Sequence, residues 1–219
     1  MKSLDLSSQR LTTLDGIDLT GVTSLDCYDN RLTSLPPLPE TLKVLYCEHN
    51  QLTSLPPLPE SLKILYCYNN QLTSLPPLPD TLKFLYCHNN QLTSLPPLPE
   101  TLKTLYCHTN QLTSLPPLPE TLENLDCYNN LLTSLPHLTT LKELYCSSNP
   151  LTSLPDLPWS LINMSIEKLD QHNKRLSDLG MEVVETLPAQ PIWDQINERH
   201  INWLYRIGGE KYKETVSKF

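Results

Sequence analysis

The sequence predicts a solenoid, in which stacked short repeats each add one strand to a curved parallel β-sheet on the concave side. The first observation is a fixed period, because one twenty-residue phrase occurs in four nearly identical copies and four looser ones. The second is that leucines recur at the same positions of each copy, and the third is that most copies end in a proline-rich segment. The eight copies start at Met1, Val22, Leu42, Leu62, Leu82, Leu102, Leu122 and Leu141.

The copy that starts at Leu82 shows how one repeat is built. Leu85 and Cys87 are two residues apart, so both side chains point to the inner side of a short strand and Tyr86 points outward. Together with the asparagine that follows, they form the pattern L-x-x-L-x-C-x-x-N-x-L, which is typical of a leucine-rich repeat solenoid. One unit cannot bury its leucines alone, so neighbouring repeats stack and form one continuous core.

A turn and an extended return segment follow each strand. The side chain of Asn90 both donates and accepts, so we expect it to satisfy backbone groups of the turn inside the stack. The first copy has Gln9 instead, as is common in a terminal repeat. The return segment at residues 95–99, Leu-Pro-Pro-Leu-Pro, has too many prolines for a helix and suits an extended, polyproline-II-like convex side. Asparagine stands at the turn in seven copies, at Asn30, Asn50, Asn70, Asn90, Asn110, Asn130 and Asn149.

All seven cysteines occupy one position of the repeat. We interpret them as a column of small, buried, reduced hydrophobic side chains. Neighbouring strands lie about 4.8 Å apart, a distance that does not exclude disulfides. The odd number of cysteines and the lack of a secretion signal argue against pairing. The column consists of Cys27, Cys47, Cys67, Cys87, Cys107, Cys127 and Cys146.

The chain divides into a solenoid at residues 1–166 and a tail at residues 167–219. The solenoid holds eight repeats and a degenerate ninth strand that ends at Ile166. In the tail, apolar residues recur at helical spacing, and Trp193 and Trp203 fall on one stripe of a predicted helix. We expect this helical tail to cap the open end of the solenoid. The alternative is an appendage whose helix binds a partner independently.

Composition excludes several classes of function. Of the formal net charge of −8, the repeats supply −7, because residues 1–160 hold 15 acidic and 8 basic residues. Nucleic-acid binding needs clustered lysine and arginine, so we expect none. The chain lacks the apolar run of about 18 residues that spans a membrane and the apolar stretch of a signal peptide. We therefore expect a cytoplasmic protein.

Motifs for catalysis and cofactors are missing from the sequence. It contains no G-x-S-x-G, P-loop or dinucleotide fingerprint. We therefore expect a protein that is not an enzyme, without catalytic residues or cofactors. His88 and His108 stand on adjacent repeats, but no carboxylate is placed to complete a metal site with them, so we expect no bound metal.

The outward face of the sheet is the candidate site, because repeat packing does not determine its residues. Tyrosine combines apolar area with a hydroxyl and is enriched at interfaces, so we expect another protein to bind there. The alternative is a stacked aromatic ladder that only stabilises the sheet, or simple copying of one repeat. The candidate residues are Tyr46, Tyr66, Tyr86, Tyr106, Tyr145, Ile64, Phe84, His88, His108, Lys63, Lys83 and Lys103.

The phrases Leu-Pro-Pro-Leu-Pro-Glu-Thr-Leu and Leu-Tyr-Cys-x-x-Asn, across about residues 1–166, resemble the short bacterial leucine-rich repeats of YopM-like effectors and IpaH-like ubiquitin ligases. Repeat proteins of large DNA viruses are similar to a lesser degree. The resemblance implies partner binding on the concave side. For an effector or viral protein, the expected location is the cytosol of a host cell. No cysteine follows Cys146, so the catalytic-cysteine domain of the ligases is not expected.

We therefore expect a non-enzymatic protein-interaction module, present as a monomer or weak homo-oligomer. The alternative is an adaptor, in which the repeats hold a target while the C-terminal helix recruits ubiquitination or signalling machinery. An enzyme with its site in the tail is disfavoured, because the tail offers only His172 and His200 and no cysteine.

Overall fold

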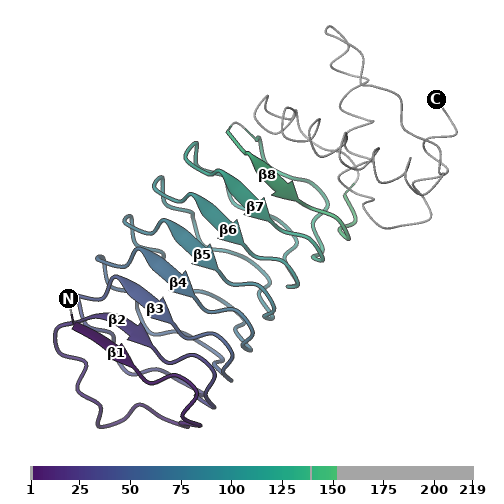
Figure 1. Ribbon diagram of the computed structural model, residues 1–219. Coiled ribbons are helices and arrows are strands. Elements are labelled where there is room, and N and C mark those ends of the chain that lie inside the picture. The colour runs from purple at the N-terminus through teal and green to yellow at the C-terminus, as the bar shows by residue number, and fades with distance from the viewer. Residues whose placement is uncertain (1, 139, 152–219) are drawn as a thin grey trace, which may run out of the picture.

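The computed structural model describes residues 2–138 and 140–151, which coil into a stack of repeats with one sheet along its side (Figure 1). The strands of these residues form one parallel eight-stranded sheet in chain order. The predicted parallel solenoid with one strand per copy is confirmed. The strands are β1 (Lys2–Asp5), β2 (Val22–Asp26), β3 (Val44–Tyr46), β4 (Ile64–Tyr66), β5 (Phe84–Tyr86), β6 (Thr104–Tyr106), β7 (Asn124–Asp126) and β8 (Glu143–Tyr145).

Neighbouring strands pair at equivalent positions of the repeat. In β4 and β5, Leu65 lies opposite Leu85 and Tyr66 lies opposite Tyr86. The central leucine of each strand from β3 to β8 is buried, and the residue after it points outward, which is the alternation expected of a strand. Each kind of side chain therefore forms a column that runs from repeat to repeat.

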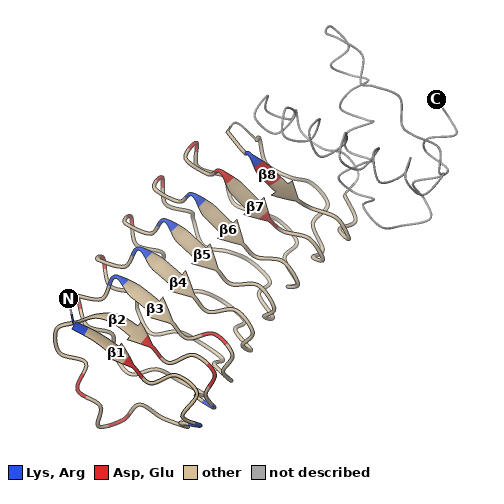
Figure 2. Cartoon of the chain, in the orientation of Figure 1, with Lys and Arg blue, Asp and Glu red and all other residues tan. Residues whose placement is uncertain are grey.

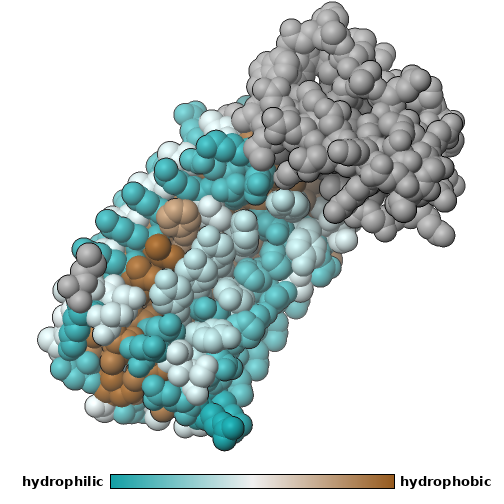
Figure 3. All heavy atoms as spheres, in the orientation of Figure 1, coloured by the Kyte–Doolittle hydropathy of each residue, from teal (hydrophilic) through white to brown (hydrophobic). Residues whose placement is uncertain are grey.

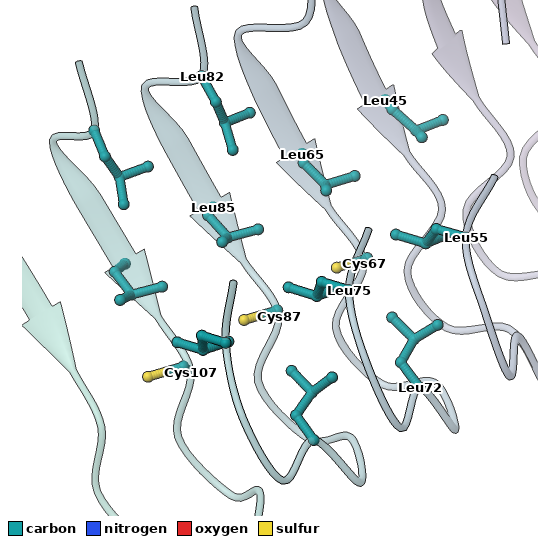
Figure 4. Close-up of a cluster of buried hydrophobic side chains, with 14 of the residues drawn as sticks. Leu45, Leu55, Leu65, Cys67, Leu72, Leu75, Leu82, Leu85, Cys87 and Cys107 are labelled. Carbon is teal, nitrogen blue, oxygen red and sulfur yellow. The ribbon is translucent and has the colours of Figure 1, made fainter. Parts of the chain in front are cut away.

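The core consists of these inward columns. In the copy that starts at Leu82, Leu82, Leu85, Cys87 and Leu92 are fully buried, and Leu98 packs against them from the return segment. Figure 4 shows the same columns in neighbouring repeats, with Leu45, Leu65 and Leu85 on the strands, Cys67, Cys87 and Cys107 after them, and Leu55 and Leu75 opposite. Stacking thus buries leucines that no single repeat covers.

The buried cysteines give a first prediction. All seven are buried, and the thiols of Cys27 and Cys47 lie 3.2 Å from the carbonyl oxygens of Tyr46 and Tyr66. Burial raises the pKa of the Cys87 thiol to about 12, which disfavours the reactive thiolate. A thiol-reactive chromogen should titrate seven thiols in denaturant under non-reducing conditions and few in the native protein. Fewer than seven in denaturant would contradict the reduced column.

The predicted asparagine ladder is confirmed by its hydrogen bonds. The Asn90 amide nitrogen donates to the carbonyl oxygens of Cys67 and Cys87, both at 3.1 Å, and of His88 at 3.2 Å. Its side-chain oxygen accepts from the backbone N–H of Leu72 at 3.0 Å. Asn90 therefore joins its own turn to the preceding repeat. Asn30 extends the ladder to the atypical first copy, where the backbone N–H groups of Gln9 and Leu11 donate to its side-chain oxygen.

The residue before each asparagine of the ladder has a left-handed backbone conformation, which was not predicted from the sequence. Asn69, Asn89 and Asn129 adopt φ values of 52°, 52° and 53°, and Thr109 adopts 52°. Asparagine tolerates this region, but a β-branched threonine does not. The turn thus contains local strain in the copy that has Thr109.

Thr109→Asn should therefore stabilise the protein, by about 1 kcal/mol, because asparagine relieves this strain. Thr93→Asn is the matched control, because Thr93 is exposed and has no positive φ. Urea unfolding curves for the two variants provide the measurement. A midpoint for Thr109→Asn at or below that of the unmodified chain would show that the turn is not strained.

The return segments form neither helix nor strand. A second ladder of hydrogen bonds, which was not predicted from the sequence, links the turn after each return segment to the same turn of the preceding repeat. The Thr81 hydroxyl donates to the Leu62 carbonyl oxygen at 2.7 Å, and the Thr101 hydroxyl donates to that of Leu82 at 2.7 Å. No helix in the described part is long and apolar enough to cross a membrane. The degenerate ninth strand, the helical tail and its tryptophans lie outside the described residues.

Candidate protein-interaction surface

The outward residues of the strands and of the positions beside them form what we call the sheet face. It carries four columns across the central repeats. The lysine column is Lys43, Lys63, Lys83 and Lys103, just before the strands; the apolar column is Val44, Ile64 and Phe84; the tyrosine column is Tyr46, Tyr66, Tyr86 and Tyr106; and the ring column is Tyr68, His88, His108 and Tyr128.

The tyrosine column is a continuous run of touching rings. The ring centroids of Tyr46 and Tyr66 are 5.0 Å apart, and those of Tyr66 and Tyr86 are 4.3 Å apart and nearly parallel. Tyr106 meets Tyr86 edge-on at 5.1 Å. Burial, together with the neighbouring Tyr86, raises the pKa of Tyr66 to about 12, so its hydroxyl stays a neutral donor and acceptor. Each of these four rings is half-buried, which leaves an outer edge for contact.

The fifth predicted tyrosine is separate from this column. Asp126 of β7 lies between Tyr106 and Tyr145 in the sheet register. Tyr145 itself is 42% exposed. The structure therefore brings four of the five candidate tyrosines together and leaves Tyr145 beyond an acidic side chain.

The ring column is a second stack beside the first. Ring centroids are 4.3 Å apart for Tyr68 and His88, 4.2 Å for His88 and His108, and 4.4 Å for His108 and Tyr128, all with small interplanar angles. Only the two histidines of this column were among the candidate residues predicted from the sequence. Burial, and then the neighbouring His108 and His49, lower the pKa of His88 to about 4, so the stacked imidazole is neutral. Among the described residues no three His, Cys, Asp or Glu side chains gather as metal ligands.

Glu48 stands next to this column, at the same repeat position as Tyr28 and Tyr68. It is only 6% exposed, and its Oε2 atom has no hydrogen-bond partner in the described part of the chain. Burial raises the pKa of its carboxyl from 4.5 to about 7, with a smaller contribution from Asp26 and an opposing backbone hydrogen bond. Glu48 was not among the candidate residues predicted from the sequence, because its burial depends on the large rings in the neighbouring repeats.

Glu48→Gln should change how stability depends on pH. The folded chain binds the Glu48 proton more tightly than the unfolded chain, so the unmodified protein loses stability as pH rises from 4.5 through about 7. His88, whose pKa is lowered, acts in the opposite direction, and Asp126, whose pKa is raised to about 6, acts in the same direction. Both groups are present in both chains, so the comparison isolates Glu48.

We expect the free energy of unfolding of Glu48→Gln, relative to the unmodified chain, to rise between about pH 4.5 and pH 7 and then to level off. Urea unfolding at about pH 5, 6 and 8 measures this difference. A difference that is the same at all three pH values would show that Glu48 does not titrate in this range.

The lysine column runs along one edge of the sheet face, where Figure 2 shows blue segments in line at the starts of β3 to β6. All four lysines are exposed. Lys103 approaches Glu123 of the next repeat at 3.8 Å, whereas Lys43, Lys63 and Lys83 form no ion pair with any described residue. The positive charge is therefore least compensated beside β3 to β5.

The apolar column lies between the lysines and the tyrosines. Ile64 and Phe84 are half-buried, and their positions are taken by Thr104 in β6 and Asn124 in β7. Figure 3 shows a short brown row between a teal edge and a pale band on this side of the molecule. Asp26 and Asp126 bound the tyrosine column at either end. The central repeats thus carry a patch that is basic on one edge, apolar and aromatic in the middle, and acidic at both ends.

Comparison with known proteins identifies the architecture. Three segments of the chain, residues 40–80, 80–120 and 120–159, match the family described as leucine-rich repeats (2 copies). These segments span more than half of the 219 residues. The chain belongs to the leucine-rich repeat family. Such proteins are typically interaction scaffolds, and the matches indicate no catalytic family.

Solved structures of bacterial effectors are similar to this leucine-rich repeat protein. YopM from Yersinia enterocolitica WA-314 has a TM-score of 0.66 and 37% identity, over 71% of this chain and 35% of YopM. YopM from Yersinia pestis, described as a leucine-rich effector protein, has a TM-score of 0.61 and 35% identity, over 71% of this chain and 51% of that YopM chain. A Shigella effector leucine-rich repeat domain has a TM-score of 0.57 and 32% identity, over 77% of this chain and 76% of that domain. The repeats are therefore of the bacterial-effector type, as predicted.

The leucine-rich repeat chain spans between about a third and a half of the length of the two YopM chains. No curated protein sequence matches it. The weaker similarity to viral repeat proteins stays a prediction.

Proposed function

We propose that this protein binds another protein through the sheet face, with the tyrosine and apolar columns at the centre of the contact. The observation that carries the proposal is the composition of the patch over β3 to β6. Half-buried tyrosines stand beside Ile64 and Phe84, with lysines at one edge and acidic side chains at both ends. Interfaces combine an aromatic and apolar core with a polar rim in the same way.

Sheet stability accounts for only part of this patch. Stacked rings such as Tyr66 and Tyr86 stabilise the sheet by roughly 0.5–1.5 kcal/mol for each pair beyond their buried area. The lysine column has the opposite effect, because like charges on neighbouring strands repel one another. Lys43, Lys63 and Lys83 stand in line and form no ion pairs with the described residues. If the columns served only to stabilise the sheet, these aligned lysines would contribute nothing. An acidic surface on a partner supplies the missing counter-charges.

The proposal extends to the setting of the interaction. The Yersinia pestis and Shigella relatives are described as effectors. We extend that role to this protein, in which the repeats engage a target protein without catalysing a reaction. The identity of the target follows from capture experiments rather than from the repeats themselves.

Site-specific photo-crosslinking tests the proposal. Replacing Tyr66 by p-azidophenylalanine keeps the ring in place on the sheet face, and the matched probe replaces Ser94, which is exposed directly before the return segment. The Tyr66 probe should capture a protein from host-cell lysate that the Ser94 probe does not capture, and an excess of unlabelled protein should compete for it. Equal capture from both positions, or capture from Ser94 alone, would remove the sheet face as the binding surface.

A further inference from the structure

We propose that the sheet face receives an amphipathic α-helix of the partner, lying across β3 to β6 along the axis of the solenoid. One stripe of the helix is acidic and faces the lysine column, and the adjacent stripe is apolar and faces the apolar and tyrosine columns. This inference rests on the proposed function and specifies the partner segment.

Backbone hydrogen bonding favours a helix over an extended segment on the sheet face. The strands β3 to β6 are interior strands of the sheet, and their backbone groups pair with the strands on both sides. A strand from a partner adds to a sheet edge and not to a sheet face. An extended segment laid on the face leaves its own N–H and C=O groups without partners in a contact that excludes water. A helix satisfies these groups internally.

The sheet face is about as wide as one helix. The strands β3 to β6 are three residues long, which corresponds to roughly 10 Å. A helix with its side chains is about 10–12 Å in diameter. One helix therefore covers the apolar and tyrosine columns together and reaches the lysine column at the edge.

The spacing of the lysine column fits the repeat of a helix better than that of an extended strand. Successive lysines of the column are one strand spacing apart, about 4.8 Å, so the four span about 14 Å. Acidic residues on one stripe of a helix recur every turn, about 5.4 Å, and four of them span about 16 Å. The flexible lysine side chains accommodate that difference of about 2 Å. The same face of an extended strand repeats every 6.8 Å or so, and four such residues span about 20 Å, which exceeds the column.

Carboxylates at both ends of the patch limit the length of the bound helix. Asp26 and Asp126 stand in the tyrosine column on either side of the four tyrosines. Glu123 also interrupts the lysine column at β7. These carboxylates repel an acidic stripe that continues past β3 or β6. The favoured segment therefore has about four turns, or about 14 residues.

Designed peptides test the inference against the full chain. The first probe is a stapled helix of about 15 residues with Glu at i, i+4, i+7 and i+11 and an adjacent Leu/Phe stripe. The second has the same composition with Glu at every second position and no staple, and the third is the stapled helix with Lys in place of Glu. Fluorescence anisotropy at low ionic strength, where exposed charges are least screened, measures the affinity of each.

Charge reversal on the protein provides the second arm. Lys63→Glu with Lys83→Glu changes the net charge by −4, and both side chains are exposed. Gln51→Glu, Gln71→Glu, Gln91→Glu and Gln111→Glu also change it by −4, at exposed positions beyond the asparagine turns. Circular dichroism verifies that both variants are folded. The lysine variant should bind the acidic helix about tenfold more weakly or worse and should bind the Lys helix more tightly, whereas the glutamine variant should stay within about twofold.

Three results overturn the inference. They are equal binding of the alternating peptide, no binding of the acidic helix at millimolar concentration, and equal weakening by the glutamine variant. Any of these leaves the proposed function standing if the Tyr66 probe still captures a protein. A fourth result, equal binding of the acidic helix after Tyr66, Tyr86 and Tyr106 are changed to alanine, overturns both the inference and the proposed function.

Discussion

Changing Tyr66, Tyr86 and Tyr106 together to alanine should weaken binding of the partner by about four orders of magnitude. These rings form the centre of the tyrosine column, with Ile64 and Phe84 beside them. Interface energy concentrates in a few central aromatic residues, each of which costs about 2 kcal/mol or more when truncated. Three such losses, about 6 kcal/mol, correspond to roughly four factors of ten in the dissociation constant.

The protein captured through Tyr66 is the ligand for this measurement, and isothermal titration or surface plasmon resonance gives its affinity. The matched control changes Gln71, Gln91 and Gln111 to alanine, in the same three repeats but away from the sheet face. The triple tyrosine variant should melt at a lower temperature, because ring stacking is lost, but it should keep its circular dichroism spectrum, because the rings point away from the core. Undiminished affinity in a folded variant would reduce the tyrosine column to a structural ladder.

Asn90→Ala should lower the free energy of unfolding by about 3 kcal/mol. The substitution removes three donated hydrogen bonds and one accepted bond. It leaves the carbonyl oxygens of Cys67 and Cys87 and the N–H of Leu72 without this partner inside the stack. Because Asn90 joins two repeats, the loss affects an interface between repeats as well as one turn.

Gln91→Ala is the control for this prediction. Gln91 is the next residue along the chain and its side chain is exposed, so its loss should change stability by no more than about 0.5 kcal/mol. The midpoint and slope of urea unfolding distinguish the two variants. Indistinguishable midpoints would mean that the asparagine ladder adds nothing to stability.

Two periods in the sequence were sufficient to predict the parallel solenoid of the described residues. The twenty-residue period indicated one strand per copy, and the two-residue spacing of Leu85 and Cys87 indicated which side of each strand is buried. The role of Asn90 was also predictable, because one side chain with both a donor and an acceptor stands where the chain turns. These features depend only on the local pattern and its repetition.

Other features depend on neighbours in the stack and were not predictable from one copy. Glu48 is buried because large rings stand at the same position in the flanking repeats. The left-handed residue varies in type, as His49 and Thr109 show, so no single residue marks it. Among the candidate residues, the alignment of tyrosines and of lysines in neighbouring repeats follows from the twenty-residue period, whereas the separation of Tyr145 by Asp126 required the register of the sheet.

The left-handed turns also affect the denatured chain. Glycine usually supplies such turns, yet the described residues after Gly21 contain none, and the return segments are rich in proline. A chain with few glycines and many prolines has fewer backbone conformations available when it unfolds. Unfolding therefore yields a smaller gain in entropy than for a glycine-rich solenoid of the same length. The stiffness of the unfolded state therefore adds to the free energy of unfolding, in addition to the contacts of the native fold.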